Sequence, residues 1–285
     1  MNLASPSQVK AWCQANGFHP NKVLGQNFLI DRNALNAILD AARLVPGERV
    51  LEIGPGLGAL TEGLLERGCT VVAVEKDPVL ADRLAEALGR PEALAVIKGD
   101  ALDLAKVGQL DGFPTMVSNL PYQAGTRILL ELIKRLDIAL AAKDETATPS
   151  PREEPPAKIV ILVQTEVAER LAAGPGSKTR GLAGVWAQLD YDVRIVREVA
   201  ASCFWPRPEV GSSVVELVRH HRNDGLTPDE RELFRRLVKQ AFEHRRKQLG
   251  SIFKGYIQST ARAEELENED WISLVKALVP PHTEA

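Results

Sequence analysis

The stretch VSNLPYQAG, residues 117–125, places an amide, a stiff turn and an aromatic ring directly after an apolar run typical of a buried strand. Asn119 can accept a hydrogen bond through its side-chain carbonyl, and Leu120 can accept another through its backbone carbonyl. Pro121 stiffens the turn, and Tyr122 offers a flat ring for stacking. The simpler interpretation is a strand that ends in a turn, with Asn119 as a cap. The alternative is a pocket that holds a flat ring bearing an amino group.

A glycine-rich stretch, VLEIGPGLGALTE, lies between a predicted strand and a predicted helix. Its glycines, at 54, 56 and 58, allow positive φ and a close approach of a ligand to the backbone. The following helix offers free amides at its N-terminus. With Ala59 the stretch fits the loose dinucleotide pattern G-x-G-x-x-G/A, but that pattern alone does not separate a binding loop from a tight turn.

Two acidic residues end the next two predicted strands. Glu75 lies 21 residues after Gly54, where a doubly wound fold places a carboxylate against ribose hydroxyls. Asp100, in KGDA, can accept a hydrogen bond from the exocyclic amine of an adenine. Each acid alone could be a loop carboxylate that local amides satisfy. Together with the glycine loop they favour one ligand that contains adenosine, bound at the carboxyl ends of parallel strands.

NAD and S-adenosylmethionine both contain adenosine. Glu52 completes an E-x-G-x-G spacing that is common in methyltransferases. A dehydrogenase would also need a hydride-accepting substrate site, and the sequence offers no candidate for one. The pattern therefore favours S-adenosylmethionine.

These residues depend on a predicted sheet. Short apolar runs alternate with helical patterns, which predicts an α/β fold of βαβ units with right-handed crossovers. The predicted strands are 49–54, 70–77, 94–100, 115–120, 158–164, 192–199 and 212–218. The last two lack a long helix between them. We therefore expect an antiparallel hairpin at the edge of a mostly parallel, seven-stranded sheet.

Two segments depart from this alternation. Residues 143–156 are polar and proline-rich, which predicts a mobile surface loop. After Arg219 helical patterns replace strand patterns, which predicts a small helical domain over 220–285 beside a catalytic domain over 1–219. From Arg231 to Lys254 there are eight Lys or Arg and two Glu, although the chain has a net charge of −3. A solvated helix face would explain this charge as well as a nucleic-acid surface would.

Composition narrows the class of protein. The 285 residues are 45% hydrophobic, enough for a sizeable core, and no apolar run approaches the roughly 18 residues of a membrane span. The three cysteines are far apart and follow no metal-ligand or disulfide spacing. The first residues contain no apolar signal core. We therefore expect a cytoplasmic protein with neither a metal nor a membrane partner.

Four motifs in order resemble one family. They are LGQNFLID at 24–31, NLPY at 119–122, FWPRPEVGSSVVEL at 204–217 and AFEHRRKQL at 241–249. NLPY is similar to the Asn/Asp-Pro-Pro-Tyr signature of methyltransferases that act on amino groups. Together the motifs look like those of the small-subunit ribosomal RNA adenine N6,N6-dimethyltransferases. The resemblance implies a class I, Rossmann-like methyltransferase fold, S-adenosylmethionine as cofactor, and a monomer that acts on the rRNA of the immature small subunit.

The resemblance implies a role for each residue of NLPY. Asn119 and the Leu120 carbonyl would accept the two N6 hydrogens of an adenine, on a turn that Pro121 stiffens. Tyr122 would stack on one face of the ring, and Phe204 would close the other. Both acceptors would strengthen as positive charge develops on N6.

Further sites follow from the same resemblance. Residues 1–32 would include an N-terminal lid. Three cations in the helical tail would reach RNA phosphates: Arg245, Arg246 and Lys247. The cofactor site would comprise Asn27, Leu29, Gly54, Gly56, Glu75, Asp100 and Asn119.

Several positions depart from the family pattern. Gln123, Ala124 and Gly125 stand where many members have Asn-Ile-Ser. TRGLAG at 179–184 replaces a Tyr-Gly-Arg-Leu-Ser stretch, and Glu209 stands where a cation is usual. These departures leave the target and the number of methyl groups open.

Two other functions compete. One is N6-methylation of large-subunit rRNA, as in the related resistance methyltransferases, which share the QNF and Asn-x-Pro-Tyr motifs. The other is a ribosome-assembly factor that binds RNA without catalysis. Intact Glu75, Asp100 and Asn119 argue against the second.

Overall fold

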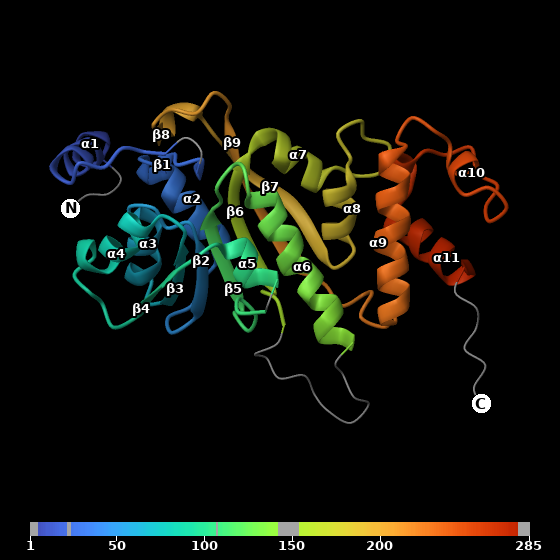
Figure 1. The fold of residues 1–285 in the computed structure, drawn as a ribbon, viewed down its shortest axis with the longest axis horizontal. Coiled ribbons are helices and arrows are strands. Elements are labelled where there is room, and N and C mark those ends of the chain that lie inside the picture. The colour runs from blue at the N-terminus through green and yellow to red at the C-terminus, as the bar shows by residue number, and fades with distance from the viewer. Residues whose placement is uncertain (1–4, 22–23, 107, 142–153, 279–285) are drawn as a thin grey trace.

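A seven-stranded sheet with the order β4-β3-β2-β5-β6-β9-β7 lies at the centre of the computed structural model (Figure 1). The structure describes residues 5–21, 24–106, 108–141 and 154–278. All seven predicted strands are present, with ends within two residues of the expected bounds. They are β2 (Arg49–Ile53), β3 (Thr70–Glu75), β4 (Leu94–Lys98), β5 (Thr115–Asn119), β6 (Lys158–Gln164), β7 (Tyr191–Val199) and β9 (Ser212–Arg219).

The sheet is mostly parallel, as predicted. β4, β3, β2, β5 and β6 pair in parallel. The predicted antiparallel edge is also confirmed, because β9 runs antiparallel to both β6 and β7. β9 lies between its two partners, so β7 forms the edge of the sheet.

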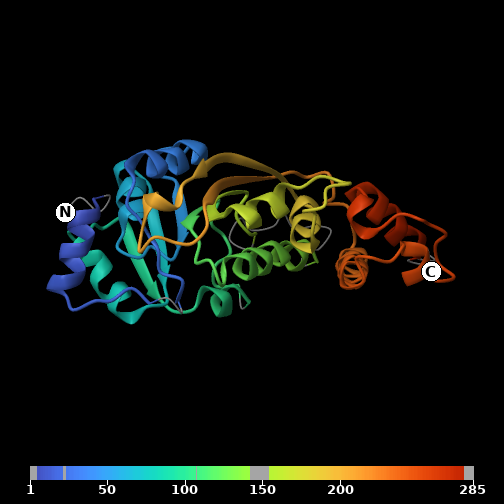
Figure 2. The ribbon, with the colours of Figure 1, turned by 90° about the horizontal axis from the view of Figure 1, so that it is seen from above.

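Helices cover both faces of the sheet (Figure 2). Ile159 and Ile161 belong to the core under one face, and Val160 and Leu162 to the core under the other. The first core includes α5 (Ala101–Lys106), α6 (Gly125–Ala141), α7 (Thr165–Ala172) and α8 (Leu182–Gln188). The second includes α2 (Arg32–Ala42), α3 (Ala59–Glu66) and α4 (Pro78–Ala87). Strands buried on both faces read as continuous apolar runs, which is why the sequence located them.

The N-terminal segment packs beside the glycine loop. It contains α1 (Pro6–Ala15) and a two-residue strand, β1 (Phe28–Leu29), that pairs antiparallel with β8 (Phe204–Trp205). Val9 and Phe28 share a small core with Leu57, which lies within the glycine loop. This packing brings the GQNF motif to the carboxyl edge of the sheet. Whether the segment acts as a lid stays a prediction.

The C-terminal part is helical, as expected. It comprises α9 (Pro228–Glu243), the short α10 (Leu249–Ile252) and η3 (Ala263–Glu265), and α11 (Asn268–Leu278). These elements lie at the opposite end of the long axis from α1 (Figure 2). Their core also includes Val185 and Trp186 of α8, so α8 joins the two parts. The domain boundary after Arg219 stays a prediction.

The predicted mobile loop at 143–156 falls mostly on 142–153, which lie outside the described residues. In the part of the chain that the structure describes, no helix is long and apolar enough to cross a membrane.

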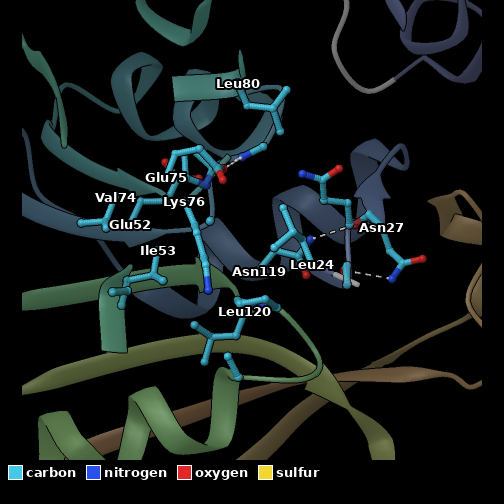
Figure 3. Close-up of a pocket in the computed structure, with 18 of the residues that line it drawn as sticks. Leu24, Asn27, Glu52, Ile53, Val74, Glu75, Lys76, Leu80, Asn119 and Leu120 are labelled. Carbon is cyan, nitrogen blue, oxygen red and sulfur yellow. Dashed lines mark hydrogen bonds between the residues drawn. The ribbon is translucent and has the colours of Figure 1, made fainter. Parts of the chain in front are cut away.

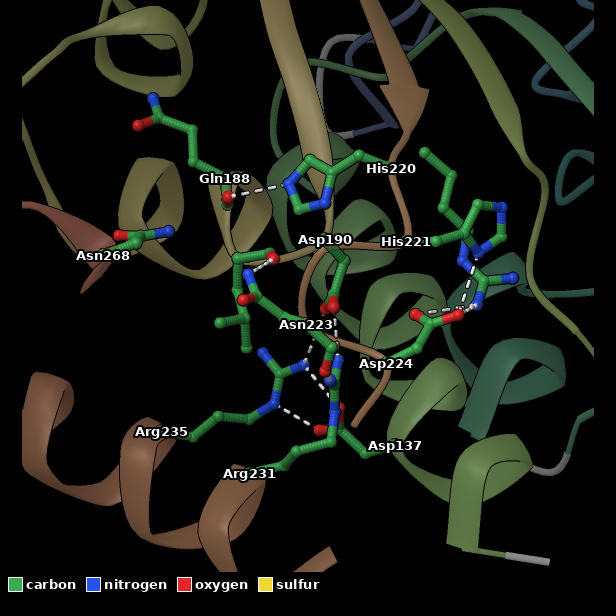
Figure 4. Close-up of polar contacts among 12 residues, drawn as sticks. Asp137, Gln188, Asp190, His220, His221, Asn223, Asp224, Arg231, Arg235 and Asn268 are labelled. Atoms are coloured by element: carbon green, nitrogen blue, oxygen red, sulfur yellow. Dashed lines mark hydrogen bonds and ion pairs between the residues drawn. The ribbon is translucent and has the colours of Figure 1, made fainter. Parts of the chain in front are cut away.

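Buried ion pairs connect α9 to the sheet domain (Figure 4). Arg231 of α9, whose side chain is 0% exposed, donates from Nε to Asp137 of α6 at 2.6 Å and from Nη2 to the buried Asp190. Arg235 also pairs with Asp137. Burial raises the pKa of Asp137, but the guanidiniums of Arg235 and Arg231 outweigh burial and lower that pKa overall. Two of the eight basic residues counted in the sequence therefore belong to the interior rather than to a surface for nucleic acid.

The buried pairs predict an asymmetry between two arginines. Arg231→Ala removes the close partner of the buried Asp190 and leaves only Arg235, whose Nη2 lies 3.9 Å from Asp190 Oδ2; we expect it to lower the free energy of unfolding by about 3 to 5 kcal/mol. Arg222→Ala removes an ion pair with Asp192 in which both side chains are more than half exposed, and should cost less than about 1 kcal/mol. Urea denaturation of both variants checks this. Equal losses would show that the buried pairs do not stabilise the junction.

Candidate active site

A cavity of about 280 Å³ opens at the carboxyl ends of β2, β3 and β5 (Figure 3). This volume is near the lower end of small-molecule pockets, about 300 Å³. The cavity brings together all of the predicted cofactor residues: Asn27, Leu29, Gly54, Gly56, Glu75, Asp100 and Asn119. Leu120, Pro121 and Tyr122 line it as well. The structure therefore gathers residues that are far apart in the sequence into one site.

The glycine loop forms the floor of this cavity. Gly54 and Gly56 have φ of +70° and +59°, in the left-handed region that favours glycine. A Cβ on Gly56 would lie 3.0 Å from Cδ1 of Phe28. The loop therefore needs glycine both for its backbone shape and for the packing of the N-terminal segment against it.

Glu75 is a buried carboxylate that holds the loop to the end of β3. Its Oε2 accepts a hydrogen bond from the Gly56 amide at 3.1 Å, and its Oε1 accepts one from the Asp77 amide at 2.8 Å. Burial raises the pKa of Glu75, and the two amides oppose that increase. Each oxygen keeps a second lone pair, so the carboxylate can still accept hydrogen bonds from a diol.

Asp100 lies in a different environment. Its Oδ2 accepts a hydrogen bond from Lys76 Nζ at 2.7 Å, and its Oδ1 accepts one from the Leu102 amide at 2.9 Å. The bond from Lys76 lowers the pKa of Asp100. Lys76 also lines the cavity, and the sequence analysis did not single it out.

The Asn119 amide is oriented by the N-terminal segment. Its Nδ2 donates to the backbone carbonyl of Asn27 at 3.3 Å (Figure 3). A carbonyl only accepts, so the NH₂ group must face it and the side-chain Oδ1 must face elsewhere. Among the described residues, neither this Oδ1 nor the carbonyl oxygen of Leu120 accepts a hydrogen bond. The site thus presents two adjacent acceptors that have no hydrogen-bond partner in the described ranges.

The ring of Tyr122 is anchored at its hydroxyl. That hydroxyl lies 2.6 Å from Ser212 Oγ, and burial raises its pKa. Phe204 packs edge-on against Tyr122, with ring centroids 6.4 Å apart, and is only 2% exposed. Phe204 does not line the cavity, so its place over an adenine stays a prediction.

One departure from the family has a packing reason. Gly125, where many members have Ser, begins α6 directly against Leu120. A Cβ on Gly125 would lie 2.9 Å from the Cβ of Leu120, closer than real contacts allow. The glycine lets the NLPY turn sit tightly on the helix that follows.

The predicted RNA-binding cations lie away from this cavity. They form a turn after α9 rather than part of a helix. Arg245 donates to the Lys178 carbonyl and lies 3.6 Å from Glu264. Arg246 and Lys247 are exposed. Two of the three are therefore available to a partner without breaking a described contact.

Besides Lys76, sequence reasoning missed three residues that support the site. Ser212 anchors Tyr122, and Ser118 Oγ accepts the Ile53 amide at 2.8 Å beside the glycine loop. Asp77 receives a hydrogen bond from Gln26 at 2.8 Å. Only Asp77 left a signal, as an acid before proline at the start of a predicted helix. Within the described ranges, no group of three His, Cys, Asp or Glu side chains is placed to hold a metal ion.

The sheet order and the cavity at its carboxyl edge define a Rossmann-like methyltransferase fold. Solved structures agree. The chain is similar to a dimethyladenosine transferase from Plasmodium falciparum, with a TM-score of 0.68 at 22% identity over 86% of this chain and 94% of that one. It is also similar to a 23S rRNA methyltransferase, ErmE, with a TM-score of 0.63 at 24% identity over 88% and 99%. At these identities the likeness shows the fold.

The chain belongs to the ribosomal RNA adenine dimethylase family, whose sequence model matches residues 17–276. It is 38% identical to ribosomal RNA small subunit methyltransferase A of Arthrobacter sp. (strain FB24), over 92% of this chain and 84% of that protein. It is 35% identical to the protein of the same name from Bifidobacterium longum subsp. infantis, over 97% and 94%. The family resemblance of the four motifs is confirmed.

Glu52 is the most deeply buried acid in the cavity wall. It is 1% exposed, and its Oε2 has no hydrogen-bond partner among the described residues. Burial, helped by the nearby charge of Glu75, raises the pKa of Glu52 to about 8. The side chain is therefore mostly protonated at neutral pH.

This pKa predicts a pH-dependent stability. In the unfolded chain Glu52 titrates near pH 4.3, so the folded state binds its proton more tightly and loses stability as pH rises from about 4 to 8. Between pH 4 and pH 8 we expect the free energy of unfolding contributed by Glu52 to fall by as much as roughly 4 kcal/mol. Glu52→Gln, which cannot titrate, should not show this fall. Urea denaturation across that range checks it, with the exposed Glu66→Gln as control. Parallel pH profiles for wild type and Glu52→Gln would contradict the assignment.

Proposed function

We propose that this protein transfers methyl groups from S-adenosylmethionine to N6 of adjacent adenosines in small-subunit rRNA, two to each, during maturation of the subunit in the cytoplasm. The observation that supports it most directly is a pair of acceptors on the wall of the cavity, Asn119 Oδ1 and the Leu120 carbonyl, that no described residue engages. An adenine N6 has two hydrogens to donate to such a pair. Membership of the family and the names of the relatives support the same reaction.

The residues of the cavity fit S-adenosylmethionine. Glu75 can accept hydrogen bonds from the ribose hydroxyls, and Asp100 from the adenine amine. Gly54 and Gly56 let the backbone approach the ligand. The side chain of Leu29 and the polar groups of Asn27 complete the wall. When bound, this cofactor supplies an electrophilic methyl group on a sulfonium.

The chain's own residues must then aim the target nitrogen. The lone pair of an adenine N6 is delocalised into the ring, so the amine has to be drawn toward a tetrahedral form. Asn119 Oδ1 and the Leu120 carbonyl do this by accepting hydrogen bonds from its two N–H groups. Both hydrogen bonds strengthen as positive charge develops on N6. Tyr122, held by Ser212, offers its face to the ring. The rest of the rate enhancement comes from holding the nitrogen, the methyl carbon and the sulfur in line.

The competing functions have less support. Relatives that cover most of the chain are named as small-subunit enzymes, whereas the likeness to a large-subunit enzyme rests on the fold. The intact acceptor pair and acid positions argue against a binding factor without catalysis. The direct test is transfer of tritiated methyl from the cofactor to each ribosomal subunit, taken from cells that lack the modification, followed by mapping of the labelled adenosines.

Asn119→Ala tests the acceptor pair. It removes one acceptor and leaves the Leu120 carbonyl, so the nitrogen is less well aimed and less stabilised. By analogy with the loss of one oxyanion-hole donor, we expect single-turnover methyl transfer at saturating RNA and cofactor to slow about 100- to 1,000-fold. RNA binding should be nearly unchanged, because phosphate contacts provide most of that affinity. Tyr122→Phe, which keeps the ring, should be mild, and Tyr122→Ala severe. A rate for Asn119→Ala within a few-fold of wild type would mean that NLPY is only a turn at the end of a strand.

The RNA surface gives a separate prediction. Arg246→Gln with Lys247→Gln should weaken RNA binding and reduce the log–log salt slope by about 1.4 to 1.8, the value for two lost phosphate contacts. Arg236→Gln with Lys239→Gln makes the same charge change at exposed positions of α9 and serves as the matched control. Filter binding at several salt concentrations measures both. The same slope in the two double variants would mean that general charge, and not this turn, binds the RNA.

A further inference from the structure

Two adjacent residues of the N-terminal segment contact the two halves of the active site. Gln26 Nε2 donates to Asp77 Oδ2 at 2.8 Å, beside the predicted ribose carboxylate. The next residue, Asn27, accepts the Asn119 amide through its backbone carbonyl at 3.3 Å. Because the two residues are joined by a peptide bond, a shift of the Gln26 side chain from Asp77 also shifts the Asn27 carbonyl.

The Gln26 side chain has a defined orientation. Its Oε1 accepts a hydrogen bond from the Asn21 amide at 2.7 Å, and its own backbone amide donates to the Asn21 carbonyl at 3.2 Å. An amide N–H only donates, so Oε1 must face Asn21 and the NH₂ group must face Asp77. Both ends of the side chain are thus engaged.

Asp77 is a rigid anchor for that NH₂ group. It is 7% exposed. Its Oδ1 caps α4 by accepting the amides of Val79 at 2.9 Å and Leu80 at 3.3 Å, which leaves Oδ2 for Gln26. Its own amide donates to Glu75. A chain of hydrogen bonds therefore runs from the N-terminal segment through Asp77 to Glu75.

The contact between Asn27 and Asn119 is long and cannot hold the segment in place by itself. The χ2 torsion of an asparagine is broad, so without the Asn27 carbonyl the Asn119 amide can turn and present NH₂ where Oδ1 should be. A displaced carbonyl would thus convert an acceptor for N6 into a donor that repels it. The β1–β8 pairing holds the chain just after Asn27, and the bond from Gln26 to Asp77, at 2.8 Å, holds it just before.

We propose that Gln26 is a positioning residue for methyl transfer, which acts through its hydrogen bond to Asp77 to keep the Asn27 carbonyl against Asn119. This inference rests on the proposed function, because it concerns the orientation of the amide that receives N6. Gln26 touches neither reacting atom in this role. Its effect should appear in the rate of transfer at saturating cofactor.

An exchange of hydrogen-bond direction tests the contact. Gln26→Glu keeps the acceptor for Asn21 but sets a carboxylate against Asp77, and should slow single-turnover transfer about 10- to 100-fold, the cost of a small misplacement. Adding Asp77→Asn supplies a donor on Asp77's Oδ2 side, keeps the helix cap on Oδ1, and restores the net charge. The double variant should recover to within about 3-fold of wild type. Asp77→Asn alone sets the new side-chain NH₂ against the NH₂ of Gln26, so its single-turnover transfer should be slow.

The control disrupts another contact between the N-terminal segment and α4. Arg83 donates to the Asn16 side chain, away from Asn27, so Arg83→Gln loosens a different contact of the segment and should transfer methyl at the wild-type rate. Thermal unfolding of each variant should stay close to wild type. If Gln26→Glu transfers at the wild-type rate, or the folded double variant does not recover, the inference fails.

A readout independent of activity separates this inference from the proposed function. The side-chain NH₂ signals of Asn119 can be assigned by NMR as those missing from Asn119→Ala. Their hydrogen exchange should be faster in Gln26→Glu and return toward the wild-type value in the double variant. Unchanged exchange overturns the positioning role even if methyl transfer occurs. Wild-type protein that methylates no rRNA, with the exchange pattern as expected, overturns the proposed function and retains the orienting role of Gln26.

Discussion

Parallel strands in one sheet must end at the same edge, and the active site depends on this constraint. β4, β3, β2 and β5 are paired in order, so the residues after their last hydrogen bonds lie side by side. Gly54, Glu75, Asp100 and Asn119 each follow or end one of these strands. A shift of one residue in any pairing would turn the site residue of that strand to the opposite face. The apolar residues on both faces of the sheet therefore specify the site as much as the polar residues do.

Three acids in one cavity differ because their surroundings differ. Burial dominates at Glu52, whose Oε2 has no hydrogen-bond partner among the described residues, and its pKa rises to about 8. Glu75 is buried but receives two backbone amides, which moderate the increase. Asp100 accepts a hydrogen bond from Lys76, which lowers the pKa of Asp100. Asp100 is thus held in its ionised form where an amine is proposed to bind, whereas the deeply buried Glu52 is mostly protonated at neutral pH.

The strands and the polar residues at their ends were predictable, and the contacts between distant segments were not. Runs such as KIVILVQ have the length and composition of strands buried on both faces, so β6 was located to the residue. β1 and β8 are two residues each, too short for any periodicity. The clustering of cations after residue 230 was visible, but the burial of Arg231 and Arg235 depends on Asp137 and Asp190, which are far away in the chain. The link from Gln26 to Asp77 is equally non-local, although both residues lie next to motifs that the sequence revealed.

The shared core between α8 and the C-terminal helices bears on how relatives could diverge. Trp186 packs in that core and lies with its ring 5.4 Å from the guanidinium of Arg235. Arg180, which is 1% exposed, reaches across to Asn268 of α11. A recombination event that exchanged the chain after Arg219 would separate these partners and leave large apolar and cationic groups mismatched at the junction. The C-terminal helical part therefore packs as one unit with α8, and we expect a folded chimera to need a transplanted segment that begins before residue 180.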